Sequence, residues 1–410
     1  MLRKIRIILA LVSIVLVTLL FVDFTGTSAR YFGWLAKIQF LPAVFSANVV
    51  VLIALAVLTL LLGRVYCSVI CPLGIMQDIF GRFGRMGRKH RYRYSYSPSL
   101  TILRIAVFAA WVLAIIIGVS VITTLLAPYS AYGRIAQTLL QPIWIFGNNL
   151  LADAAERADN YAFYRVDIWL RSPLTLTVAV LTLIVLGVLA WRNGRTYCNT
   201  ICPVGTILGY LSQFSLFKPV IDKSKCVNCG LCARKCKASC IDSKNHSIDY
   251  TRCVACMDCI DTCTHGAISY TRRRLVQKPA TADAPDYGRR IFLGAGLALG
   301  SAAIAKAQEK VTDGGLAPIL DKKRPERRTP IAPPGSKSLR HLSDHCTACQ
   351  LCVAECPNGV LRPSTDIDRF MQPESSFERG YCRPECTRCS DVCPAGAILP
   401  LTVEDKTAVR

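Results

Sequence analysis

Residues 226–263 read CVNCGLCARKCKASCIDSKNHSIDYTRCVACMDCIDTC, in which the cysteines recur twice at the spacing C-x2-C-x2-C-x3-C. A 4Fe-4S cluster needs four soft thiolate ligands. A short loop supplies three of them, and the fourth comes from the other run when two clusters are paired. We therefore predict two clusters here. One would be bound by Cys226, Cys229, Cys232 and Cys263, and the other by Cys236, Cys253, Cys256 and Cys259.

A second stretch, residues 346–393, repeats this arrangement with one additional residue between the first two cysteines of its last run. The same exchange of the fourth ligand predicts two further clusters. Their ligand sets would be Cys346, Cys349, Cys352 and Cys393, and Cys356, Cys382, Cys386 and Cys389. Pro357 and Pro394 follow their runs as in the bacterial pattern, whereas Lys237 and Thr264 depart from it in the first stretch.

Other uses of cysteine fit this spacing less well. Zinc ribbons also contain paired C-x2-C elements, but three cysteines at successive x2 spacings followed by a fourth favour an iron–sulfur cluster. Disulfide scaffolds belong to small secreted domains, whereas these cysteines stand in tight, regular runs. Cys240 lies outside the pattern, four residues after Cys236, and we predict that it is a buried packing thiol.

The chain is also rich in apolar residues. Hydrophobic residues make up 52% of its 410 positions and charged residues 19%, which indicates segments in a lipid bilayer. Four apolar stretches have about the length needed to cross roughly 30 Å of hydrocarbon. We expect membrane helices over residues 7–22, 43–62, 105–126 and 174–191. No convincing cleavage pattern of small residues precedes Tyr31, so we expect the first helix to be retained.

The distribution of charge predicts the orientation of these helices, because Lys and Arg collect in short cytoplasmic loops. The loop between the second and third stretches is strongly basic and contains one acidic residue, Asp78. Segment 127–172 balances four Arg against four Asp and Glu, which suits the outer side. The N-terminus and the region after Trp191 are then cytoplasmic. Most of the formal charge of +22 lies in residues 1–305, and this distribution does not favour a nucleic-acid partner.

An internal repeat follows the second and fourth apolar stretches. At an offset of 131 residues, the segment from Gly63 to Gly74 matches the segment from Gly194 to Gly205, and each contains C-x3-C-P. Two similar halves predict a pseudo-symmetric four-helix unit. On a helix, cysteines four positions apart share one face. The two pairs either form a redox or metal site or are apolar packing residues at helix ends; they are Cys67, Cys71, Cys198 and Cys202.

The region between the two cysteine-rich stretches resembles a twin-arginine export signal. Arg289 and Arg290 precede Phe292 and Leu293, and a modest apolar stretch of small residues follows. Such a signal would carry the second module across the membrane with its clusters already inserted. The alternative is an ordinary arginine pair that flanks a helix on the inner side. The residues from Ala305 to Ala307 also resemble the A-x-A pattern of a signal-peptide cleavage site.

These features together resemble the NapH-type membrane ferredoxins over roughly residues 1–275, because both have four helices, two C-x3-C-P motifs and a cytoplasmic two-cluster domain. The remainder is similar to the exported NapG-type partner, with fewer cluster-binding runs than that partner carries. The resemblance implies an electron-transfer subunit of a quinol dehydrogenase, which draws on the quinol pool and serves a periplasmic reductase or cytochrome. NosR and FixG-like proteins share the C-x3-C-P core, and they imply the alternative of a redox accessory factor for a metalloenzyme.

The expected fold is a membrane α-helical protein with two α+β ferredoxin domains of the bacterial two-cluster type. Its parts would be a four-helix membrane domain (residues 1–215), a cytoplasmic ferredoxin domain (216–275), a signal-like fifth helix (276–307), a linker (308–340) and a periplasmic ferredoxin domain (341–410). The protein would lie in a bacterial inner membrane. The sequence contains no nucleotide-binding fingerprint and no His in the apolar stretches, so direct NADH oxidation and a bis-His haem in the bilayer are not expected.

Overall fold

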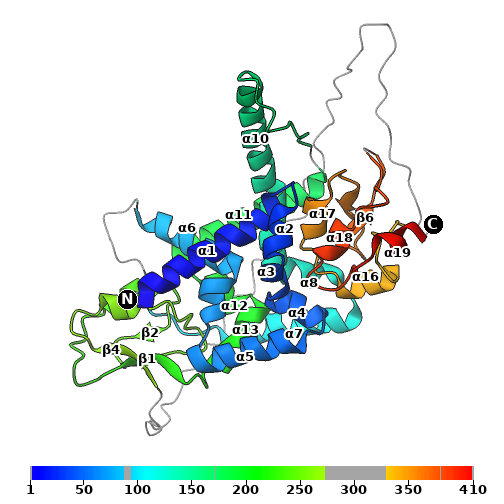
Figure 1. The fold of residues 1–410 in the computed structure, drawn as a ribbon. Helices are drawn as coiled ribbons and strands as arrows, with labels where there is room; N and C mark the ends of the chain where they lie inside the picture. Colours follow the sequence, from blue (N-terminus) through cyan, green and yellow to red (C-terminus); the bar gives the residue numbers. More distant parts are fainter. Residues whose placement is uncertain (1, 87–93, 170, 273–328, 379, 409–410) are drawn as a thin grey trace, which may run out of the picture. The chain divides into compact units, whose positions relative to one another are not determined.

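The computed structural model describes residues 2–86, 94–169, 171–272, 329–378 and 380–408. The expected export signal and most of the linker lie outside the described residues. Helices dominate the first half of the chain (Figure 1). They are α1 (Leu2–Val22), α2 (Thr27–Phe32), α3 (Trp34–Lys37), α4 (Phe40–Phe45), α5 (Val49–Leu62), the π-helical turn η1 (Tyr66–Ile70), α6 (Pro72–Met86), α7 (Thr101–Ile117), α8 (Ser120–Leu126), α9 (Pro128–Ile135), the π-helical turn η2 (Ala136–Leu140), α10 (Gln141–Glu156), α11 (Pro173–Asn193), α12 (Thr196–Thr200) and α13 (Pro203–Ser212).

Two of these helices are long and apolar enough to cross a membrane, α1 and α11, with 21 residues each. At 1.5 Å per residue, each is about 31 Å long. Both expose much of their apolar surface. Only 33% of the most apolar 18 residues of α1 are buried, and only 22% of those of α11. In a soluble protein, helices of this composition would be covered. The predicted helices 7–22 and 174–191 therefore correspond to α1 and α11.

The predicted helices 43–62 and 105–126 are not continuous, and this part of the prediction is wrong. In the first, Ala47 has a left-handed φ of 51° and the side chain of Asn48 caps α5 by accepting a hydrogen bond from the Val51 N–H at 3.2 Å. In the second, Gly118 ends α7 with a φ of 85°. The helices that remain, α5 and α7, have 14 and 17 residues. The described residues therefore do not form the expected core of four full-length membrane helices.

The first cysteine-rich stretch forms a small α+β unit, the first module. Its elements are β1 (Phe217–Ile221), α14 (Leu231–Lys235), β2 (Ile241–Asp242), β3 (Ser247–Ile248), α15 (Asp258–Thr262) and β4 (Ile268–Arg272). Strand β1 pairs antiparallel with β4, from Phe217 opposite Arg272 to Ile221 opposite Ile268, and β2 pairs with β3. The module has its own apolar core, which contains Ala233, Val254 and Ile268.

The second cysteine-rich stretch forms the second module, built from α16 (Leu339–His345), α17 (Leu351–Glu355), β5 (Leu361–Pro363), β6 (Pro373–Ser375), α18 (Arg388–Asp391) and α19 (Val403–Ala408). Strands β5 and β6 pair antiparallel. Unlike the first module, it shares one continuous apolar core with the helices of the first half of the chain, in which Leu351 and Val353 belong to the same cluster as Phe21 of α1. The second module is thus packed into the helical domain.

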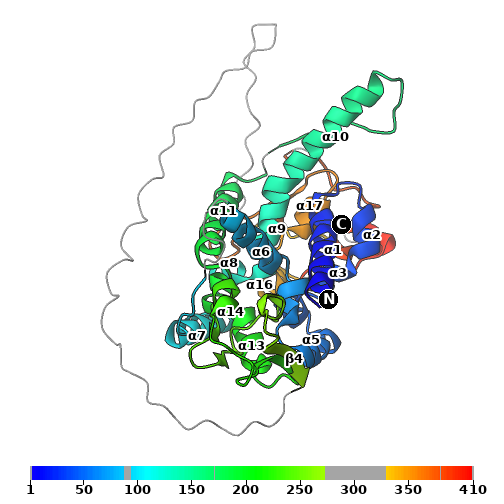
Figure 2. The same ribbon diagram turned by 90° about the vertical axis from the view of Figure 1, so that its left-hand side faces the viewer.

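Helix α1 contacts one module at each of its ends. Near its start, the Arg3 guanidinium pairs with Asp258 at 2.9 Å and with Asp261 at 2.5 Å, both in α15. Just beyond its end, the Phe24 carbonyl accepts a hydrogen bond from Arg388 of α18 at 3.4 Å. Helix α11 packs along α6, and α10 extends away from the other helices in both views (Figures 1 and 2). The modules are therefore separated by roughly the length of α1.

Candidate iron–sulfur site

One cavity in the first module is lined by Cys236, Cys253, Cys256 and Cys259. These are the four residues that the spacing assigned to one cluster. Cys240 lines the same cavity, and its sulfur lies 3.5 Å from that of Cys236. It is buried, and its role as a packing thiol stays a prediction.

A cavity in the second module is lined by Cys346, Cys349, Cys352 and Cys393. This set also matches one that the spacing assigned to a single cluster. Backbone N–H groups point at two of its sulfurs, from Ala348 to Cys346 and from Ile398 to Cys393, both at 3.4 Å. Such N–H donors stabilise thiolate charge and tune the potential of a bound cluster.

The remaining two sets are brought together to different extents. Cys389 interacts electrostatically with Cys356, Cys382 and Cys386, which completes the predicted set in the second module. In the first module Cys232 interacts in the same way with Cys226 and Cys229. The sulfur of Cys263, the predicted fourth member, accepts a hydrogen bond from the Ala267 N–H at 3.3 Å. Ligation by the sixteen cysteines remains a prediction.

The backbone of three cysteine runs has a common local conformation that turns the chain around the thiols. In each, the middle cysteine stands between two left-handed residues: Asn228 and Gly230, Ala255 and Met257, and Ala348 and Gln350, with φ between 48° and 68°. Residues other than glycine adopt this conformation at a cost, and they concentrate at functional loops. The described part of the fourth run, which is one residue longer, has no such pair.

The donor chemistry of these cavities fits an iron–sulfur cluster. Within the described residues, no three Cys, His, Asp or Glu side chains surround a point where a single metal ion would bind. A cubane differs from a single ion because each of its thiolates binds a different iron, so its ligands stand further apart. Four thiols around one closed cavity are the ligand set that a 4Fe-4S cluster takes.

The C-x3-C-P motifs form a separate group of thiols between the two repeats. All four cysteines are buried, and each of Cys71, Cys198 and Cys202 interacts electrostatically with others of the group. The two cysteines of each pair do not share one helix. Cys71 and Cys202 lie where a short helix ends, and Pro72 and Pro203 begin the next. The backbone N–H of Cys71 donates to the carbonyl of Tyr66, and that of Cys202 donates to the carbonyl of Tyr197, each at 3.0 Å.

Two arginines hold the repeats together in a reciprocal way. Arg195 of the second repeat donates to the carbonyl of Cys67 at 2.6 Å, and Arg64 of the first donates to the carbonyl of Cys198 at 3.2 Å. Arg64 and Arg195 occupy equivalent positions of the repeat. Each repeat therefore makes the equivalent contact with the other, whereas the predicted pseudo-symmetric four-helix unit stays a prediction.

Asp78 of α6 links this group to α1 and to the first module. Its carboxylate pairs with Arg195 at 2.7 Å, with Lys237 at 2.7 Å and with Arg6 at 3.1 Å. Burial by itself would raise the pKa of Asp78, but the charges of Arg195 and Lys237 hold that pKa well below its usual range. The Asp78 side chain is therefore ionised and holds three elements together.

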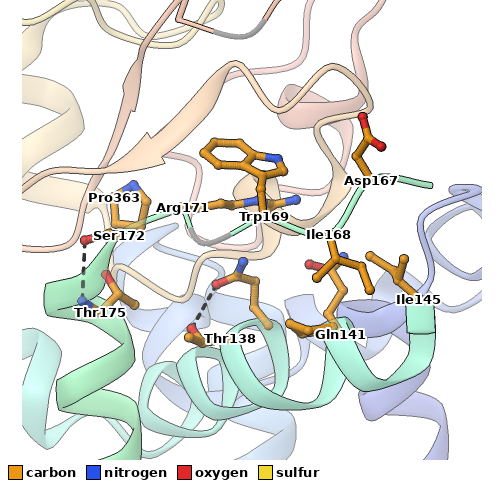
Figure 3. Close-up of a pocket in the computed structure, with 12 residues that line it drawn as sticks. Thr138, Gln141, Ile145, Asp167, Ile168, Trp169, Arg171, Ser172, Thr175 and Pro363 are labelled. Atoms are coloured by element: carbon orange, nitrogen blue, oxygen red, sulfur yellow. Dashed lines mark hydrogen bonds between the residues drawn. The ribbon is translucent and has the colours of Figure 1, made fainter. Parts of the chain in front are cut away.

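A pocket of about 260 Å³ with both polar and apolar lining residues lies beside the second module (Figure 3). Thr138 and Gln141 line one side of the pocket. Trp169, Arg171 and Ser172, from the segment before α11, line the side that faces them. Gln141 and Arg171 reach the module itself, where they donate to the carbonyls of Ala354 and Val353. This pocket could not be predicted from the sequence, because its lining comes from separate segments and has no motif.

Comparisons with known proteins agree with this chemistry. The family described as "4Fe-4S binding domain" matches residues 46–91 and 174–222, which are the two repeats with their C-x3-C-P motifs. The putative electron transport protein YccM of Escherichia coli is 26% identical over 58% of this chain and 59% of its own length. The regulatory protein NosR of Stutzerimonas stutzeri is 24% identical over 49% of this chain and 23% of its own length.

The pyruvate synthase subunit PorD of Methanothermobacter marburgensis is 43% identical over 18% of this chain and 88% of its own length. The chain thus spans less than two thirds of YccM and NosR but nearly all of PorD. No solved structure matches. The cysteine cavities and these relatives lead to one conclusion, that the chain belongs to the 4Fe-4S ferredoxin-type proteins.

Proposed function

We propose that this chain is a membrane-bound electron-transfer protein of the NapH type with a NapG-like second module. It takes electrons from quinol and passes them through four 4Fe-4S clusters to a periplasmic reductase or cytochrome. When bound, a 4Fe-4S cluster supplies one-electron redox chemistry at a potential that its surroundings set. The protein's residues bind the clusters, exclude water and hold the modules in place.

The contacts of α1 carry this proposal. An apolar helix of 21 residues has the length of the hydrocarbon core, and it contacts the first module at one end and the second at the other. If α1 crosses the membrane, the two modules lie on opposite faces. The basic loop that contains Arg82 favours the cytoplasmic side for the N-terminus and the first module.

Sidedness is tested with reporters fused after Tyr270 and after Arg410. We expect the first to report a cytoplasmic location and the second a periplasmic one in a bacterial inner membrane. Replacing Arg289 and Arg290 by Lys should then leave the second reporter inside. Unchanged export of the second module in a strain that lacks the twin-arginine translocase would contradict this topology.

The pocket beside the second module, whose lining is partly polar and partly apolar, supports a small quinol as the electron donor. A quinol headgroup needs hydrogen-bonding partners at its two oxygens, and Gln137, Thr138 and Gln141 supply such groups. Arg171, which also lines the pocket, interacts electrostatically with Cys352 and Cys356. The pocket is therefore next to predicted cluster ligands.

The experiment adds a reduced menaquinol analogue to anaerobic membranes that contain the protein and follows the bleaching of cluster absorbance. The double variant Gln137→Leu, Thr138→Val should be reduced at least tenfold more slowly. A matched control is Thr177→Val, an exposed threonine of α11 that does not line the pocket. Clusters that stay oxidised with quinol in the unmodified protein would refute quinol as the donor.

The similarity to NosR favours a second candidate, a redox accessory or maturation factor for a metalloenzyme, as NosR- and FixG-like proteins suggest. Such a factor needs few electrons, and it can take them from a protein. Reduction by a low-potential ferredoxin, together with no reduction by quinol, would favour this candidate over the first.

A further inference from the structure

Two of the cysteine loops, one in each module, have the same shape. Residues 253–259 read CVACMDC and residues 346–352 read CTACQLC, so the three cysteines have the same spacing in both. In each loop the residues on either side of the middle cysteine have a left-handed φ, between 48° and 64°. Each loop lines a cavity together with the cysteine that completes the predicted ligand set. The two cavities can therefore be compared position by position.

The two cavities differ in polarity at the second and fifth residues of their loops. Val254 and Met257 line the cavity of the first module, whereas Thr347 and Gln350 occupy the same positions in the second module and line its cavity. All four residues are buried. Met257 fills its position with an apolar side chain of about the same length as that of Gln350. Packing alone therefore does not require an amide at this place.

The side-chain amide of Gln350 is buried without a hydrogen-bond partner. The residue is 1% exposed, and within the described part of the chain neither its amide oxygen nor its amide nitrogen has a partner. An amide has two N–H donors and an acceptor oxygen, and it is costly to leave them unpaired in a buried place. Thr347 is also buried, and its hydroxyl interacts with the thiol of Cys349. Both side chains therefore call for a partner in the cavity that they line.

Other buried glutamines near the second module do have partners. Gln372 donates to the carbonyl of Ser343 at 3.1 Å, and Gln141 donates to the carbonyl of Ala354 at 3.3 Å. Gln350 differs from both, because neither atom of its amide is paired among the described residues. A partner that belongs to the cavity, rather than to the chain, accounts for this difference.

We propose that Gln350 and Thr347 donate hydrogen bonds to the sulfurs of the 4Fe-4S cluster that the cysteines of this cavity would bind, and that they thereby raise its reduction potential. Reduction adds negative charge to the cluster, so donors at its sulfurs stabilise the reduced form more than the oxidised form. Neither side chain is a ligand of iron. Both act on the group that the cysteines hold.

A raised potential has a use under the proposed function, on which this step rests. A quinol is a weak reductant, so a cluster that it reduces needs a comparatively high potential. Arg171 lines the pocket proposed for the quinol and interacts electrostatically with Cys352, which lines this cavity. The cluster with the two donors would therefore be close to the pocket, and it would accept one electron at a time without any bond being made or broken. The effect of the donors on its potential does not depend on the identity of the electron donor.

The test is a redox titration, followed by EPR, of the full-length protein purified anaerobically in detergent. Gln350→Met introduces the residue that stands at the equivalent position of the first module. We expect unchanged iron content and a shift of one cluster signal to lower potential, while the other signals keep theirs. Thr347→Val should shift the same signal in the same direction. The matched control is Gln372→Met, at a 1% exposed position of the same module that does not line the cavity, and it should leave every potential in place.

The opposite exchange in the first module provides a second, independent measurement. Met257→Gln adds a donor to the other cavity, so it should raise the potential of a different signal. Electron–nuclear double resonance in D2O supplies a spectroscopic readout. Exchangeable protons coupled to the cluster of the second module should be fewer in Gln350→Met, a change that a merely structural role would not produce.

The proposal is overturned if Gln350→Met retains its iron and leaves all potentials unchanged, or if Gln372→Met shifts the same signal equally. If Gln350→Met loses its iron, Thr347→Val and Met257→Gln decide the question, and unchanged potentials in both would overturn the proposal. Clusters that stay oxidised with quinol, together with the expected shift in Gln350→Met, would refute quinol as the donor and support the role of Gln350.

Discussion

Replacing Asp78 by Asn should strongly destabilise the protein, because this carboxylate is the shared partner of three cations. Arg195 and Lys237 have side chains only 0% and 7% exposed, and the Asp78 side chain is 15% exposed. Lys237 keeps a second partner in the variant, Asp258 at 3.4 Å, whereas none of the ion pairs in the described residues gives Arg195 another carboxylate. The substitution therefore leaves Arg195 buried and uncompensated.

Breaking a buried ion pair by removal of one partner costs about 3–5 kcal/mol, and we expect a loss in this range. The size of the loss also depends on pH. The folded-state pKa of Asp78 is lowered, so its contribution is complete above the unfolded value of about 3.9 and disappears as the pH falls through the folded value. Between pH 5 and 8 the difference between Asp78→Asn and the unmodified protein should therefore be constant.

The assay is denaturant unfolding in detergent, followed by tryptophan fluorescence under anaerobic conditions. The matched control is Asp153→Asn, which removes the carboxylate of an exposed pair whose side chains are 40% and 68% exposed. Exposed pairs contribute about 0–1 kcal/mol, so the control should stay within that range. The reasoning is refuted if the two variants lose the same stability.

Two further predictions follow from the cysteine loops and from the repeat. Cys240→Ala should keep all the iron of the first module, whereas Cys236→Ala should lose about four irons; equal losses by iron analysis would make Cys240 a ligand. Gly63→Ala and Gly194→Ala both place a side chain at a φ near +70°, but only at Gly194 would the new Cβ also collide with the Lys237 carbonyl. Gly63→Ala should lower the free energy of unfolding by about 1–3 kcal/mol, and Gly194→Ala should lower it clearly more. Equal stabilities of the two variants in the same unfolding assay would contradict the close contact at Gly194.

The cysteine sets could be predicted from the sequence because each run is local, and a short loop brings its thiols together. The structure places the Cys346 set and the Cys253 set around common cavities for this reason. The ends of the apolar helices could not be predicted from composition. Ala47 and Gly118 interrupt two of them through local backbone conformation, which hydropathy does not report.

Contacts between distant segments were also beyond the sequence. The second module packs against the helical domain through groups that carry no motif, such as Ser120 of α8, whose hydroxyl donates to the Asp368 carbonyl at 3.0 Å. The reciprocal contacts of Arg64 and Arg195 with cysteine carbonyls of the opposite repeat could not be predicted either, because they depend on which groups surround each guanidinium in the folded chain.

The most direct test of the account is iron and acid-labile sulfide analysis of the anaerobically purified protein, combined with EPR after reduction. We expect about sixteen irons and a matching amount of sulfide per chain, with spectra of reduced 4Fe-4S clusters. Stoichiometric zinc with little iron and no sulfide would contradict it.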